Sequence, residues 1–548
     1  MFRFFEILPG FLAWLTIIVI ILLSWLAPVT AAIFIILFDI YWLLKTIYLS
    51  LHLRATFVKI RENLKTNWLK KIQEQERHLA SKKSVSEAEW AWLVATKSDQ
   101  GEAKSQGTND TLGRETPSFC KAKWSDIYHL IVLPFYKEPY EVIKESFESL
   151  VKSNYPKDKF IVVLAAEEKA GEPALQTAQK IEQEFKNKFF KFLITIHPAN
   201  IPGELAGKGS NETWATRQVK KEIIDPLNLK YENILVSVFD VDTQVPKDYF
   251  GRLTYVFLNA KHPQRSSFQP VPFFTNNIFQ SSALGRVISF SSSFWQMMQQ
   301  SRPERLTTFS SHSMPFKALV EIDFWEVDIT SEDSRIFWQC YLHYNGDWRV
   351  EPLFYPVSMD ANVSPHFWGT LINLYKQQRR WGWGCENIPY LLTGLWFNKR
   401  WSPNPAPSDC PAQIPFTKKL YWSFNVIEGF HSWATNAIII FTLGWLPIFL
   451  GGYDFNFTLL SYNLPFITRW IMNLAMFGII TSAILSIILL PPKPEWFKKR
   501  HYLFYFLEWI LMPITLIIFG AIPGLEAQTR LLLGGKFRLG FWVTPKHR

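Results

Sequence analysis

The sequence is poor in cysteine and in charged residues, and both shortages restrict what the protein can be. Only 19% of its 548 residues are charged, whereas 16% are aromatic and 24 are tryptophan. Few charges and many tryptophans are typical of a chain partly dissolved in lipid, because indole rings favour the membrane interface. The cysteines lie far apart without a C-x-x-C pair, so their spacing indicates neither a structural zinc site nor a disulfide framework. They are Cys120, Cys340, Cys385 and Cys410.

Charge is missing altogether from residues 7–38, and Pro28 interrupts this apolar run. A membrane span needs about 20 apolar residues, so residues 7–50 predict two helices joined by a tight turn. A secretory signal peptide is the rival interpretation. It would have a shorter apolar core followed by a cleavage site, and a second apolar span directly after the first argues against it.

The charge that is present is mainly basic, with a net value of +11. Basic side chains at residues 54–71 follow the predicted hairpin and mark the cytoplasmic side of a membrane. We therefore expect a multi-pass integral membrane protein of the plasma (inner) membrane whose domain after the hairpin is cytosolic. Because no nucleic-acid fold signature accompanies the charge, lipid headgroups and a diphosphate substrate are the expected partners, and nucleic acid is not.

Three further apolar runs follow residue 420, and Glu508 and Pro513 interrupt the last of them. A basic loop at residues 493–500 indicates a cytosolic position. The number of spans places the C-terminus outside, whereas its basic residues indicate the cytosolic side. The sequence therefore leaves the side of the C-terminus open. The runs cover residues 434–453, 470–490 and 502–523.

Apolar strands alternate with helices from about residue 129. This pattern predicts a parallel sheet with helices on both faces, and ligands bind such sheets at the carboxyl ends of the strands. Residues 95–118, rich in serine, glycine and charge, predict a flexible surface loop. The strands are expected at 129–133, 159–164, 190–196 and 234–239, and the helices near 140–152, 174–188 and 211–224.

Two carboxylates, Asp240 and Asp242, directly follow the fourth predicted strand. Such a pair suits a hard cation, Mg²⁺ or Mn²⁺, whose other ligands are water and phosphate oxygens. The alternative is a solvated turn, since Asp-x-Asp is common by chance.

A second acidic pair lies about ninety residues later, in Thr330–Ser334. Asp333 could accept a proton from an attacking hydroxyl. The segment equally fits the start of a helix, where hydroxyls cap and acids favour the first turn.

The third motif contains Gln377, Arg380 and Trp381. Arginine offers a planar fork of donors for phosphate, and tryptophan offers a face for a sugar ring. The alternative is an amphipathic helix at the membrane surface.

These three motifs, in this order and spacing, resemble the processive branch of the family 2 glycosyltransferases, which includes cellulose, chitin and hyaluronan synthases. The resemblance covers residues 129–385 closely and the flanking helices loosely. It implies that Asp240 and Asp242 hold the metal and diphosphate and that Asp333 is the general base. It also implies that the third motif, Gln377, Arg380 and Trp381, binds the diphosphate and the acceptor.

The same resemblance implies further nucleotide-binding residues. Tyr136 and Glu138 lie in its opening strand and turn, and Lys208 lies in its Lys-Gly-Asn segment. Glu167 stands where the family has an aspartate that holds the base. Residues 311–314 look like the loop on the acceptor side.

The expected fold is a GT-A-like α/β domain with a parallel or mixed sheet, combined with transmembrane helices. The expected divisions are a hairpin (1–52), a linker (53–125), the transferase domain (126–400) and a C-terminal membrane region (401–548). The expected activity is inverting transfer of a sugar from a UDP- or GDP-sugar to a glycan or lipid-linked acceptor. A single-addition transferase and a non-catalytic scaffold or transporter remain as alternatives.

Overall fold

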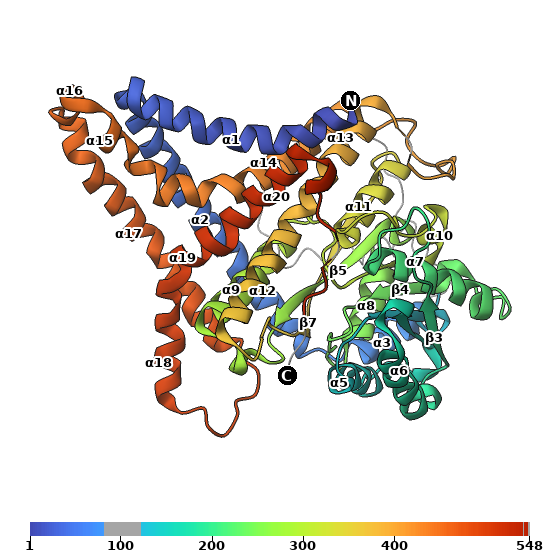
Figure 1. Cartoon of the computed structure of the whole chain (residues 1–548). Helices are drawn as coiled ribbons and strands as arrows, with labels where there is room; N and C mark the ends of the chain where they lie inside the picture. The colour runs from blue at the N-terminus through green and yellow to red at the C-terminus, as the bar shows by residue number, and fades with distance from the viewer. Residues whose placement is uncertain (82–121, 400, 541, 546–548) are drawn as a thin grey trace.

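The computed structural model describes residues 1–81, 122–399, 401–540 and 542–545. The loop expected at 95–118 and Cys120 lie outside these ranges. The described chain contains an α/β layer and a group of long apolar helices, which Figure 1 shows at the lower right and at the upper left. The predicted fold class, a mixed α/β domain combined with helices of membrane-spanning length, is confirmed.

The sheet has seven strands in the order β3-β2-β1-β4-β6-β5-β7. Strands β1 to β4 pair in parallel, β6 runs antiparallel between β4 and β5, and β5 pairs in parallel with β7. The four strands predicted from apolar runs coincide with β1 to β4. The strands are β1 (Tyr128–Phe135), β2 (Phe160–Glu167), β3 (Lys191–His197), β4 (Ile234–Val238), β5 (Ser266–Phe274), β6 (His312–Pro315) and β7 (Arg349–Met359).

Successive side chains of a strand point to opposite faces of the sheet, so a continuous apolar strand presents apolar side chains on both faces. Helices cover both of these faces. Along β1, Leu130 and Val132 enter one apolar core, whereas Ile131 and Leu133 enter the other. Helices α3 (Trp68–Ser81), α5 (Tyr140–Val151), α6 (Glu172–Phe185) and α8 (Tyr249–Asn259) cover the second face. Helices α7 (Lys208–Val219), α10 (Phe316–Glu321), α11 (Glu332–His343) and α13 (Asn387–Phe397) cover the first.

Two further helices connect the sheet to the apolar helices. Helix α9 (Ala283–Gln300) is inserted between β5 and β6 and packs on β5 and α2. Helix α12 (Phe367–Gly382) follows β7, carries the third motif and packs against α20. The motif helix therefore lies between the α/β layer and the apolar helices.

Four helical segments of the described chain are long and apolar enough to cross a membrane, or five if the bent pair Phe416–Phe441 and Leu443–Leu450 forms one span. The predicted hairpin corresponds to α1 and α2, which break at Ala27 before Pro28. Three of the four segments are α1 (Phe2–Leu26), α2 (Pro28–Leu64) and α17 (Leu459–Ile488), the fourth is Lys499–Leu533, and α14 (Phe416–Phe441) is the first part of the bent pair. The last segment comprises α18 (Lys499–Leu507), α19 (Met512–Leu516) and α20 (Ile522–Leu533), and the short helices α15 (Leu446–Leu450) and α16 (Gly452–Asn456) precede α17.

Small residues allow α1, α12 and α20 to approach closely (Figure 1). A Cβ atom on Gly10 would lie 2.6 Å from the carbonyl oxygen of Gln528 in α20. A Cβ atom on Gly382, at the end of α12, would lie 3.2 Å from the Cα of Gly524. The N-terminal helix and the motif helix are thus both packed on the same C-terminal helix.

Replacing Gly10 by alanine should destabilise the protein, because the new methyl group overlaps a backbone oxygen that cannot rotate away. We expect a loss of about 1–3 kcal/mol, typical of overpacking, measured as a lower midpoint of thermal unfolding in detergent. Gly429 in α14 is the matched control, since nothing lies within 4 Å of its added Cβ. Gly429→Ala should be neutral or stabilising, and equal midpoints for the two variants would contradict the packing described.

Candidate functional site

Two of the three predicted motifs meet at Ser310. Asp240 follows β4, and one oxygen of its carboxylate accepts a hydrogen bond from the Ser310 hydroxyl at 3.0 Å. The backbone N–H of Ser310 donates to the Asp333 carboxylate at 2.9 Å. Ser310 adopts a φ of 47°, a left-handed conformation that few residues other than glycine and asparagine adopt. A strained residue therefore joins two carboxylates that are distant in sequence.

Lys208 brings further acidic side chains to the same place. It begins α7, and its ammonium lies 3.0 Å from Asp240, 3.5 Å from Glu212 and 3.7 Å from Glu332. Burial opposes the charge of Lys208 and lowers its pKa, but the attraction of the carboxylates outweighs burial and holds the pKa well above its ordinary value. The lysine is consequently a fixed positive charge at the carboxyl end of the sheet.

The acidic partners of Lys208 do not all carry a full charge. Burial, reinforced by the negative charge of Asp333, raises the pKa of Glu332 to about 7. Burial also raises the pKa of Glu212 well above its ordinary value. Glu332 and Glu212 are buried, whereas Asp240 and Asp333 are the more exposed acids of the cluster.

Gly209 permits the close approach of α7 and α11 within this cluster. A Cβ atom at this position would lie 2.8 Å from the carbonyl oxygen of Glu326 and 3.0 Å from the Cβ of Glu332. A side chain at this position would push Glu332 away from Lys208. The packing of α7 against α11 therefore requires glycine directly after Lys208.

The third motif lies beside Phe309, the neighbour of Ser310, through its tryptophan. The positive charge of Arg380 lowers the pKa of Glu332, against the larger effects of burial and of the Asp333 charge. The Trp381 ring lies 5.8 Å from that of Phe309, the neighbour of Ser310, and 5.9 Å from that of Phe274. Gln377 is buried, and its side-chain oxygen accepts a hydrogen bond from Asn362 at 3.5 Å.

Asp242 occupies a different environment from Asp240. It is fully buried, and its carboxylate accepts a hydrogen bond from the backbone N–H of Asp360 at 2.8 Å. Asn276 donates both to the backbone oxygen of Asp242 and to the Asp360 carboxylate. Asp242 therefore fastens the end of β7 to the site, and its role as a direct metal ligand stays a prediction.

A divalent cation at this site would depend on few protein ligands. Among the described residues, no three His, Cys, Asp or Glu side chains are grouped so that they could hold a metal ion. The Asp240 carboxylate is one-third exposed, with a relative accessibility of 33%. One accessible carboxylate fits a Mg²⁺ or Mn²⁺ ion whose remaining ligands are diphosphate oxygens and water.

The predicted base-binding residue Glu167 lies at the end of β2, beside a small cavity of about 20 Å³. His197, at the end of β3, contacts Glu167 at 3.1 Å and Glu204 at 2.9 Å. Tyr136 and Glu138 follow β1, and the Tyr136 backbone N–H donates to the Glu138 carboxylate at 2.8 Å. These residues lie at the carboxyl ends of neighbouring strands, as their predicted role requires, but the role itself remains a prediction.

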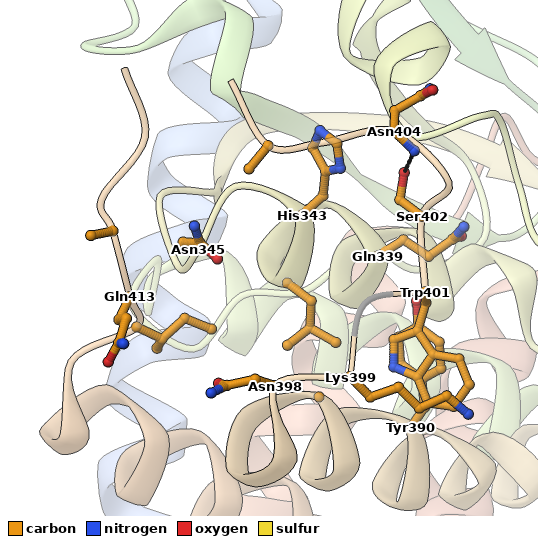
Figure 2. Close-up of a pocket in the computed structure, with 15 residues that line it drawn as sticks. Gln339, His343, Asn345, Tyr390, Asn398, Lys399, Trp401, Ser402, Asn404 and Gln413 are labelled. Carbon is orange, nitrogen blue, oxygen red and sulfur yellow. Dashed lines mark hydrogen bonds between the residues drawn. The ribbon is translucent and has the colours of Figure 1, made fainter. Parts of the chain in front are cut away.

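A larger cavity, of about 220 Å³, is bordered by the residues drawn in Figure 2. It is lined by the last turn of α11, by Tyr390 and Gly394 of α13 and by residues in 398–399 and 401–414. Amide side chains and the stacked rings of Tyr390 and Trp401 form much of its wall. None of the residues predicted to bind the nucleotide or the metal lines this cavity.

Sequence reasoning missed three residues of the site. Ser310 directly precedes the predicted acceptor-side segment, part of which forms strand β6 in the sheet. Glu212 stands four residues after Lys208, a spacing that places both on one helix face. Glu386, whose carboxylate binds Thr330 and Ser331 just before α11, carries no local signal in the sequence.

Comparison with known proteins leaves the family of this chain open. Its sequence matches no protein-family model and no curated protein. Among solved structures, a mannosyltransferase from Pyrobaculum calidifontis in complex with GDP-Man and Mn²⁺ has a TM-score of 0.36 and 12% identity, over 66% of this chain and 86% of that chain. TarS 1-349 from S. aureus in complex with UDP-GlcNAc has a TM-score of 0.33 and 13% identity, over 65% and 90%. Similarity this low assigns no function, which must come from the side chains themselves.

The charge of His197 gives a testable dependence of stability on pH. Burial lowers its pKa, but hydrogen bonds and charges from Glu167 and Glu204 outweigh burial and raise it. A raised histidine pKa stabilises the fold below about pH 6.5, and this contribution is lost as pH rises through the folded-state pKa.

His197→Gln should therefore cost about 1–3 kcal/mol at pH 6, the range for hydrogen bonds to charged groups. The difference from the wild type should shrink towards pH 9 in thermal unfolding experiments. His366, which is exposed, is the control, and His366→Gln should show no such trend. A pH-independent difference for His197→Gln would contradict the charged pairing.

Proposed function

We propose that the protein is an inverting, metal-dependent glycosyltransferase, with residues 126–400 as its catalytic domain. It transfers a sugar from a UDP- or GDP-sugar to a glycan or lipid-linked acceptor at the cytosolic face of the membrane. We propose cell-surface polysaccharide synthesis as its process. The observation that carries the proposal is the convergence of Asp240, Asp333 and the Arg380-Trp381 pair around Lys208 and Ser310.

Asp333 is the proposed general base. Its carboxylate is oriented by the backbone N–H groups of Ser310 and Ser334, at 2.9 and 2.7 Å. It accepts the proton of the acceptor hydroxyl while that oxygen attacks the anomeric carbon. The bond from this carbon to the diphosphate breaks in the same step with its electron pair leaving on the diphosphate, so the configuration inverts and no covalent intermediate is needed.

The positive groups of the site receive the negative charge of the leaving diphosphate. Lys208 is held next to Asp240, and Arg380 approaches from α12 with donors suited to phosphate oxygens. A divalent cation held by Asp240, when bound, neutralises charge on the departing diphosphate. Because Lys208 pairs with the same carboxylate, it has to move or share Asp240 when the donor enters.

The acceptor side faces the apolar helices. Phe367 and Trp368 are exposed at the start of α12, while Trp381 lies at its other end beside Phe309. An acceptor tethered to lipid, or a growing chain, can therefore approach along α12 from the membrane surface. Single addition to a polyprenyl-linked acceptor is the alternative within the same chemistry.

A non-catalytic scaffold or transporter explains the buried charges less well. Burying an ammonium with several carboxylates costs desolvation free energy. A catalytic site needs such charged groups, whereas a scaffold does not. Perturbed ionisable groups gathered at the carboxyl ends of strands are typical of functional sites.

Asp333→Asn tests the assignment of the base. An amide cannot accept the proton, so transfer should fall by about 10²–10⁴-fold, the usual contribution of general base catalysis. Donor binding should be unchanged, because Asp333 does not bind the nucleotide. Turnover of a panel of UDP- and GDP-sugars by purified protein with Mn²⁺ and calorimetry of nucleotide binding are the two measurements, and Glu184→Gln on α6 is a surface control. Lost nucleotide affinity, or normal transfer, would refute the role of Asp333.

Metal removal tests the role of Asp240. EDTA should abolish turnover, and added Mn²⁺ or Mg²⁺ should restore it. Asp240→Asn should raise the metal concentration required for half-maximal rate, measured by titrating the metal into the chelated protein. Full activity in EDTA would remove the cation from the proposed mechanism.

A further inference from the structure

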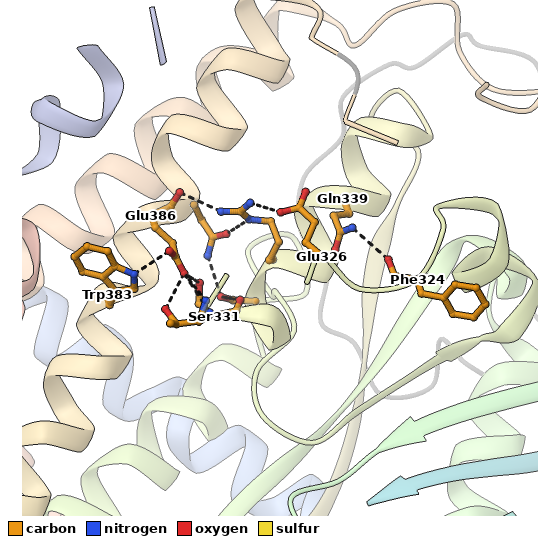
Figure 3. Close-up of polar contacts among 10 residues, drawn as sticks. Phe324, Glu326, Ser331, Gln339, Trp383 and Glu386 are labelled. Carbon is orange, nitrogen blue, oxygen red and sulfur yellow. Dashed lines mark hydrogen bonds and ion pairs between the residues drawn. The ribbon is translucent and has the colours of Figure 1, made fainter. Parts of the chain in front are cut away.

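The start of α11 is held by a residue from another part of the chain. The first N–H groups of any helix have no partner within the helix, and side chains usually supply one. The side chain of Ser331, at the N-cap position, does not do so. Glu386 binds the two residues that immediately precede the helix: one of its carboxylate oxygens accepts hydrogen bonds from the backbone N–H groups of Thr330 and Ser331, at 3.3 and 3.2 Å, and from their hydroxyls, at 3.1 and 2.7 Å (Figure 3).

The second oxygen of Glu386 accepts a hydrogen bond from the indole N–H of Trp383 at 2.8 Å. Trp383 and Glu386 belong to the short 3-10 turn that continues α12 beyond Trp381. A single carboxylate therefore bridges the end of the Arg380-Trp381 helix and the start of the helix that carries Asp333. Its negative charge also suits the positive end of the α11 dipole.

Asn387 and Arg335 tie the same two segments together. Arg335 donates to the side chain of Asn387 at 2.6 Å and to the backbone oxygen of Glu386 at 3.2 Å. Asn387 donates in turn to the Ser334 hydroxyl at 2.9 Å. Arg335 is buried, pairs with Glu326 and lies 4.0 Å from the centre of the Tyr390 ring, so it cannot shift easily.

The start of α11 thus makes different contacts on its two sides. One side faces Glu386 and Asn387, and the other presents Glu332 to Lys208 and Asp333 to Ser310. Any movement of the turn away from Glu386 changes where the Asp333 carboxylate lies.

We propose that Glu386 is a positioning residue that fixes Asp333 relative to Arg380 and Trp381. The base and the groups that receive diphosphate and acceptor are then held in one rigid frame. This proposal rests on the proposed function, because it assigns to Asp333 the role of general base. Misplacement of a reacting group by about 1 Å can cost 10²-fold in rate, so a carboxylate outside the reaction can control turnover.

Glu386→Gln is the sharpest test, because glutamine has the same shape but only one acceptor oxygen. When that oxygen faces Thr330 and Ser331, the side-chain NH₂ meets the indole N–H of Trp383, and two donors cannot bond. We expect kcat to fall about 10-fold in Glu386→Gln and about 10²-fold in Glu386→Ala. The donor KM and the nucleotide affinity should stay within about 2-fold, since Glu386 is not proposed to touch the nucleotide.

Hydrogen exchange separates positioning from general loss of structure. Amides at Thr330–Ser334 should exchange faster in both variants, whereas those of β1 and β4 should keep wild-type protection. Thr330→Val with Ser331→Ala removes two partners of Glu386 and tests the same bridge from the other side. Adding Glu386→Gln to that pair should lower kcat by less than it does alone, because residues in one network are non-additive. Glu184→Gln is the matched control, since this glutamate also accepts hydrogen bonds but lies on the surface.

The outcomes are distinguishable. Wild-type kcat and unchanged exchange in both Glu386 variants, in a protein that turns over nucleotide sugar, would overturn the positioning role and leave the proposed function standing. Loss of nucleotide affinity together with kcat, or loss of protection throughout the sheet, would show a general structural role and also overturn it. A wild-type protein without turnover would overturn the proposed function, and the positioning role with it.

Discussion

The contact between Lys208 and the buried carboxylates is the interaction on which the site depends. A buried ammonium is stable only when opposite charges lie close to it, and Lys208 has two buried acids and the partly exposed Asp240 as neighbours. Asp240 comes from the end of β4, Glu212 from α7 and Glu332 from α11, so these contacts hold three elements in one place. Gly209 lets the two helices approach closely enough for the charges to meet.

The second constraint joins this charged cluster to the apolar helices. Helix α12 ends in the cluster and packs through Gly382 on α20, which α1 contacts in turn through Gly10. Tyr375 and Arg379 on α12 both bond to Glu526 on α20, at 2.7 Å each. The proposed catalytic groups are therefore positioned by contacts with helices of membrane-spanning length as well as by the sheet, which is consistent with the proposed use of an acceptor at a membrane surface.

Much of the fold was predictable because its signals are local. Continuous apolar runs gave β1 to β4, the break at Pro28 gave the hairpin of α1 and α2, and Asp240 was placed correctly at the end of a buried strand. The antiparallel strand β6 was not predicted, because its four residues, beginning at His312, carry no periodicity and form a strand only by pairing with β4 and β5. The long helix α9 between β5 and β6 likewise went unrecognised.

The sequence by itself determined the chemical groups of the site and the elements that carry them, because acidic pairs, apolar strands and spans are properties of neighbouring residues. The tertiary structure alone decided how those groups are used. It buried Asp242 against Asp360, placed Ser310 between Asp240 and Asp333, and brought Glu386 to the start of α11. These contacts join residues about 20 to 120 positions apart, and local patterns cannot encode them since they arise only when helices and strands pack.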